Sequence, residues 1–151
     1  IIATVPATRA VCAFYGLDVA DWVRGGLVDV LCPYGFGLDA GEAALEMEFF
    51  CRAVEGSGVR LMPFVNTWRD WRRLPTLLDH ALELHRWPIH GLSVWDAGHA
   101  IQHSAWLAVT SLRSPETIRA ARDAIVAGAH HRRLRTYDGV VIDRYSFGWN
   151  F

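Results

Sequence analysis

Residues 16–34 constrain the fold more than any other part of the chain. Asp18 is an expected helix N-cap, because its carboxylate can accept hydrogen bonds from the free N–H groups of a first helical turn. Gly25 or Gly26 can adopt the left-handed conformation that ends a helix, and the mostly apolar run 28–32 that follows is typical of a buried strand. A helix that leads directly into such a strand predicts a parallel α/β sheet, in which ligands bind beyond the carboxyl ends of the strands.

Hydrophobic periodicity extends this order of strands and helices over the first two thirds of the chain. The β-branched residues 1–5 predict a further strand, and residues 7–15 are expected to be a connector, with Arg9, Cys12 and Tyr15 as its notable side chains. Pro63 lies inside one predicted strand, which favours an edge or a bulge there. The predicted strands are 1–5, 28–33, 59–65 and 91–95, and the predicted helices are 18–25, 42–54 and 74–85.

The remainder of the chain has a different pattern. A short helix is expected over 100–112, and Ser114 followed by Pro115 is a strong start for a second helix, which would end near Ala127. Asp138 and Gly139 form the favoured pair for a tight turn, so residues 134–145 predict a β-hairpin. We therefore divide the chain into an α/β part, 1–112, and a helix-and-hairpin extension, 113–151.

Composition limits the classes of partner. The chain has 151 residues, of which 52% are hydrophobic, so one domain with a sizeable core is expected. A net charge of −1 offers no electrostatic basis for binding nucleic acid or an anionic membrane, and no apolar run approaches the ~20 residues of a membrane span. The three cysteines are widely spaced and form no CxxC motif, and Cys32 and Cys51, which lie in apolar segments, are expected to be small buried side chains. We expect no nucleic-acid partner, no membrane partner and no cofactor.

The segment Gly-Leu-Asp-Val-Ala-Asp-Trp-Val-Arg-Gly-Gly-Leu-Val-Asp-Val-Leu, residues 16–31, resembles a signature of the family 10-like glycosyl hydrolases, a group of bacterial (β/α)8-barrel proteins. The resemblance covers about residues 1–100. The family pattern is approximately Gly-Leu-Asp-x-x-x-Trp-Val-x-x-Gly-Leu-Val-Asp, and the match includes Asp18, Trp22, Val23, Leu27, Val28 and Asp29.

In that family the signature lies in the second half of the barrel. The resemblance therefore implies an α/β fold made of parallel βα units that form the second half of a TIM-type (β/α)8 barrel, followed by helices and a C-terminal β-hairpin. It also implies that the first four strands, with an acid/base carboxylate after the fourth, precede Ile1; the chain opens without an initiator Met. No Glu follows the strand 59–65, where related barrels carry their nucleophile, so this piece alone is expected to be inactive.

Candidate site residues are those that follow the predicted strands. Sugars present apolar C–H faces and rings of hydroxyl groups, so their sites combine aromatic platforms with hydrogen-bonding side chains. Asp96 is the catalytic candidate, with Asp39 as a second carboxylate, because glycoside hydrolysis requires two; alternatively, Asp96 caps a turn. His99 and His103 lack a third metal ligand, so no metal site is expected. The predicted sugar-binding residues are Tyr34, Phe36, Asn66, Trp68, Asp70 and Trp95.

Three functions follow from these observations. The first is a piece of a glycoside hydrolase that acts on a poly- or oligosaccharide and supplies aromatic and polar groups to its cleft. The second is a non-catalytic carbohydrate-binding or degenerate barrel domain. The third is an open-sheet α/β domain that self-associates through uncovered strand edges. The expected partners are therefore a carbohydrate, and either the missing N-terminal half of the same chain or a second copy. The sequence is equally compatible with a protein of the bacterial cytoplasm and with an exported protein.

Overall fold

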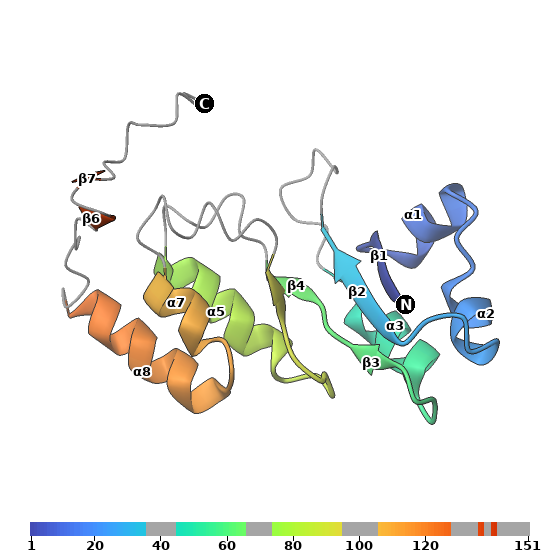
Figure 1. Cartoon of the computed structure of the whole chain (residues 1–151). Helices are drawn as coiled ribbons and strands as arrows, with labels where there is room; N and C mark the ends of the chain where they lie inside the picture. Colours follow the sequence, from blue (N-terminus) through green and yellow to red (C-terminus); the bar gives the residue numbers. More distant parts are fainter. Residues whose placement is uncertain (36–44, 66–73, 95–105, 128–135, 138–139, 142–151) are drawn as a thin grey trace.

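The computed structural model contains parallel strands, helices that pack against them, and a short C-terminal strand pair (Figure 1). Residues whose structure is described are 1–35, 45–65, 74–94, 106–127, 136–137 and 140–141. None of the helices in these ranges has the length and apolar character required to cross a bilayer.

Three parallel strands form the first sheet, in the order β1 (Ile2–Pro6), β2 (Val30–Tyr34) and β3 (Arg60–Leu61). Thr4 lies opposite Cys32, and Leu31 lies opposite Leu61. A second parallel pair contains β4 (Phe64–Val65) and β5 (Ser93–Val94). The predicted parallel α/β arrangement is therefore confirmed. The described parallel strands form two small sheets and not a closed barrel.

The predicted strand 59–65 is divided between the two sheets. Met62 and Pro63 separate β3 from β4. The Met62 N–H donates to the Leu31 carbonyl at 2.9 Å, and the Pro63 carbonyl accepts from the Ser93 N–H at 2.9 Å. Pro63 has no N–H to donate, which interrupts a regular ladder at this point. The segment thus contacts β2 along its first half and β5 along its second half.

The two helices with a predicted N-cap begin where their capping residues predict. Asp18 accepts from the Asp21 N–H at 3.0 Å and caps α2 (Val19–Arg24), and Gly26, at φ +64°, follows its end. Ser114 and Thr117 form a reciprocal capping box at the start of α8 (Pro115–Val126). The other predicted helices appear as α3 (Met47–Val54), α5 (Leu74–Leu84) and α7 (Trp106–Ser111).

The predicted connector contains a short helix, α1 (Arg9–Phe14), which the sequence does not predict. The Thr8 hydroxyl accepts from the Val11 N–H at 3.2 Å, which satisfies one of the free N–H groups of the first turn. Cys12 is the buried residue of this short helix, and the Cys12 thiol donates to the Pro6 carbonyl at 3.5 Å. Because only one turn and a half is present, no helical hydrophobic repeat develops in the sequence.

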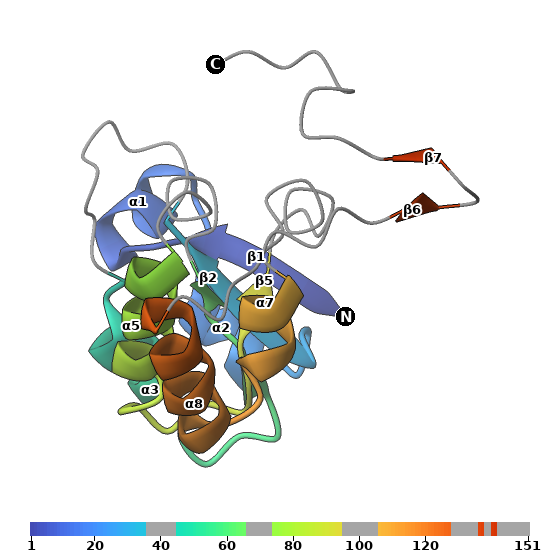
Figure 2. The same cartoon turned by 90° about the vertical axis from the view of Figure 1, so that its left-hand side faces the viewer.

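Side chains alternate between the two faces of the parallel strands, and the residues on the two faces belong to two different hydrophobic clusters. Leu31, Leu61 and Val65 belong to the main core, together with buried residues of the helices such as Phe50 and Ile118. Val30, Cys32 and Phe64 form a second cluster, with Tyr34 and Met62 packed against it. Helices α1, α3 and α5 lie on one side of β1 and β2 (Figure 2).

The last third of the chain combines a helical layer with a strand pair. Ile118 and Ala121 of α8 are buried in the main core, and Arg122 donates to Asp79 of α5 at 2.5 Å. Strands β6 (Thr136–Tyr137) and β7 (Val140–Val141) pair antiparallel, as expected for the predicted hairpin. The division of the chain at 112/113 stays a prediction.

Candidate functional site

Tyr34 is the one predicted site residue within the described part of the chain. It is the last residue of β2 and lies opposite Pro6, the last residue of β1. Its ring packs against that of Phe64, with ring centroids 4.9 Å apart and an angle of 60° between the planes. The remaining predicted residues, Phe36, Asn66, Trp68, Asp70, Trp95 and Asp96, lie outside the described residues, as does Asp39.

Tyr34 is positioned by the second cluster. Val30, Cys32 and Tyr34 alternate along β2 with Leu31 and Pro33, so they share the face opposite the main core. All members of this cluster come from β2, β4 and the residue Met62, and among the described residues no helix contributes to it. Within the described part of the chain, the half-buried Tyr34 ring therefore packs on strand residues and Met62. Burial raises the pKa of its phenol, which stays protonated and able to donate a hydrogen bond at neutral pH.

The strand that carries this ring lies next to β4 and β5. Val65 pairs with Val94 at the ends of β4 and β5, and Phe64 pairs with Ser93. The Cys32 sulfur lies 3.5 Å from the Ser93 hydroxyl oxygen, which links β2 to β5 across the same face. The carboxyl ends of β2, β4 and β5 are therefore neighbours. Among the described residues, the arrangement offers an aromatic ring, a phenol and a hydroxyl group, which can bind a neutral polar ligand; the candidate carboxylates Asp39, Asp70 and Asp96 lie outside these residues.

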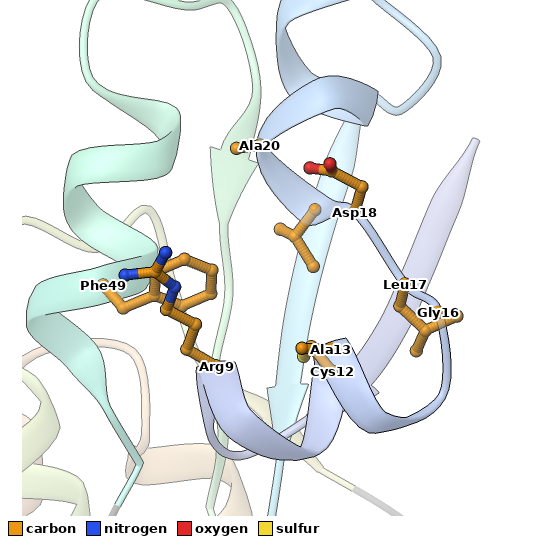
Figure 3. A pocket seen from close by; sticks show the side chains of 9 residues that line it. Arg9, Cys12, Ala13, Gly16, Leu17, Asp18, Ala20 and Phe49 are labelled. Carbon is orange, nitrogen blue, oxygen red and sulfur yellow. The ribbon is translucent and has the colours of Figure 1, made fainter.

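A second feature lies among the helices and was not predicted from the sequence. Residues of α1, α2 and α3 and of the α1–α2 connection surround an open groove of about 420 Å³ (Figure 3). The sequence does not predict it, because part of its wall comes from α1, a helix inside the predicted connector 7–15. Its lining residues are Arg9, Cys12, Ala13, Gly16, Leu17, Asp18, Val19, Ala20 and Phe49.

Metal binding receives no support from the described residues. No group of three or more His, Cys, Asp or Glu side chains in them is placed to hold an ion. His99 and His103 lie outside the described ranges.

Comparisons with known proteins add no assignment. No family model, no curated protein and no solved structure matches the chain.

Proposed function

We propose that the chain is part of a glycoside-hydrolase-like (β/α) barrel and binds a poly- or oligosaccharide at the carboxyl ends of its parallel strands. The observation that carries this proposal is the Tyr34 ring, which ends β2 and packs on Phe64 of β4. Aromatic side chains at strand ends provide the apolar face that a sugar ring requires, and the Tyr34 hydroxyl adds a hydrogen-bonding group.

Strand order supports the barrel part of the proposal. Consecutive parallel segments lie next to each other, with β2 between β1 and β3, and with β4 beside β5. An open doubly wound sheet reverses its strand order at a switch point, and the described strands contain no such reversal. Helices on one face and a strand-lined cluster on the other are also the layers of a (β/α) barrel wall. Within this proposal Trp68 and Trp95 are further platforms, Phe36, Asn66 and Asp70 line the cleft, and Asp96 is a catalytic carboxylate.

The test is sugar binding by the chain and by a Tyr34→Ala variant. We expect the variant to lose roughly tenfold or more in affinity for a soluble polysaccharide, because truncating an aromatic anchor commonly costs 2 kcal/mol or more. Affinity electrophoresis in gels that contain xylan, β-glucan or galactomannan measures the effect. The matched control is Trp87→Ala, which removes a ring that is 41% exposed and follows α5. Equal retardation of the Tyr34→Ala variant and the unmodified chain would reject the strand-end site.

Self-association through the edge of β1 is a second proposal with its own observation. In the described sheet β1 pairs with β2 on one side only, and Ile2 is 71% exposed. An exposed apolar edge strand is a template for pairing with another strand. Sedimentation at several concentrations, with Ile2→Lys as the variant, separates a monomer from an edge-paired dimer.

A further inference from the structure

The groove between α1, α2 and α3 has walls of opposite charge. Arg9 lies on one side and Asp18 on the other (Figure 3). Both side chains are exposed, and the described residues contain no ion pair that involves the Arg9 guanidinium. One Asp18 oxygen accepts from the Asp21 N–H at 3.0 Å, which leaves lone pairs for a ligand. The lining residues thus offer the N–H donors of one guanidinium and the acceptor oxygens of one carboxylate, and a second carboxylate, that of Glu46, accepts from the Arg9 backbone N–H beside the groove.

The same groove has an apolar surface held in a fixed position. Phe49 is half-buried, and its ring packs on Phe50, with centroids 4.9 Å apart at 64°. Phe50 is fully buried, so the Phe49 ring rests on the core. Leu17 is half-buried and Val19 is buried, and both line the groove. The walls therefore combine an anchored aromatic ring with aliphatic side chains.

Space for a ligand comes from small residues. Gly16 has φ +70°, and no atom lies within 4 Å of the position that a Cβ would take there. Ala13 and Ala20 also line the groove, so short side chains leave it open to solvent. The groove has a volume of about 420 Å³ and is open to solvent on one side.

We propose that this groove is a second carbohydrate-binding site, separate from the strand ends, for a neutral oligosaccharide. Each hydroxyl of a sugar both donates and accepts, so different hydroxyls of one oligosaccharide can donate to the Asp18 carboxylate and accept from the Arg9 guanidinium. The C–H face of a sugar ring fits the Phe49 ring. A small anion would be attracted by Arg9 but repelled by Asp18, and a cation would meet the reverse. The inference does not rest on the proposed strand-end site, because the groove lies among the helices.

Amide chemical shifts of the full chain test the two sites independently. We expect a neutral β-linked glucose hexasaccharide to shift the amides of Gly16, Leu17 and Phe49. An Ala13→Trp variant fills the groove without removing a buried contact, since Ala13 is exposed. It should weaken these shifts roughly tenfold in fitted affinity. The matched control is Ala10→Trp, an exposed position of the same helix outside the groove lining, which should bind as the unmodified chain does.

Two charge variants complete the test. Arg9→Gln removes an exposed positive charge, and Asp18→Asn removes the negative charge while Asn remains a good N-cap. Both should lower the affinity for the hexasaccharide. The inference is overturned if the hexasaccharide leaves the groove amides unshifted, if Ala13→Trp binds normally, or if only an oligogalacturonate shifts them, which would indicate an anion site. Shifts confined to the amides of Tyr34 and Phe64 would support the strand-end site and reject the groove site. Shifts confined to the amides of Gly16, Leu17 and Phe49 would support the groove site and reject the strand-end site.

Discussion

At the scale of single residues, local chemistry explains which side chains are anchored and which are available. Asp18 and Ser114 were expected as caps, and both accept from backbone N–H groups three residues ahead. Thr8 makes the same kind of contact but was not recognised, because the helix that it begins is too short to leave a periodic pattern. Tyr34 was expected at a strand end, and its packing on Phe64 joins residues 30 positions apart, which no local pattern encodes.

Cysteine reactivity provides a prediction at this scale. Burial, and then the negative charge of Glu46, raise the pKa of the Cys12 thiol. Alkylation requires the thiolate form. Because the pKa of Cys12 is raised, its alkylation in the folded protein should be slow and should accelerate at a higher pH than the alkylation of an ordinary cysteine. Timed iodoacetamide labelling between pH 7 and 10, read by peptide mass spectrometry, measures this rate. Cys51 is half-buried and should react first. The prediction would be contradicted if Cys12 in the folded protein were labelled as fast as Cys12 in the protein unfolded with urea.

At the scale of elements, the short strand β3 depends on a side chain for part of its pairing. The backbone N–H of His90 donates to the Leu61 carbonyl at 2.9 Å, and the imidazole Nδ1 of His90 accepts from the backbone N–H of Leu61 at 3.1 Å. One residue thus binds both backbone groups of Leu61 that face away from β2. The sequence predicts a strand at 91–95. No pattern in it indicates that the side chain of His90, just before that strand, accepts a hydrogen bond from β3.

Removing this imidazole should destabilise the sheet edge. We expect His90→Ala to lower the free energy of unfolding by about 1 kcal/mol, because the Leu61 N–H loses its acceptor. Urea unfolding followed by circular dichroism gives the value. Arg86→Ala is the control, since Arg86 forms an exposed ion pair with Glu83, and such pairs contribute about 0–1 kcal/mol. An unchanged midpoint for His90→Ala would show that water replaces the imidazole at no cost.

At the scale of the whole molecule, one core connects the α/β part to the C-terminal helices. Leu31 of β2 and Ile118 of α8 are both fully buried and belong to the same cluster. Helix α5 is the link, since it packs against both β4 and α8. Ala108 and Leu112 of this cluster precede the predicted division after residue 112, and Ile118 and Ala121 follow it.

A shared core predicts a single unfolding transition. Leu31→Ala and Ile118→Ala should each lower the stability by about 2–5 kcal/mol and shift the same transition, since each leaves a cavity in one connected cluster. Tryptophan fluorescence and circular dichroism should give coincident curves. Val126→Ala, at a position that is 64% exposed, should change the stability by less than about 0.5 kcal/mol. Two separate transitions, each sensitive to one of the substitutions, would contradict this expectation.

Sequence by itself determined the local events of this protein. Capping groups, helix-ending glycines and apolar runs act through neighbours within a few positions, so the starts of α2 and α8, the parallel α/β class and the strand end at Tyr34 could all be predicted. Tertiary structure alone decided how the strand around Pro63 divides between two partners, that His90 completes β3, and that Arg9, Asp18 and Phe49 share one groove. These contacts join segments distant along the chain, and their geometry depends on how the helices pack on the sheet.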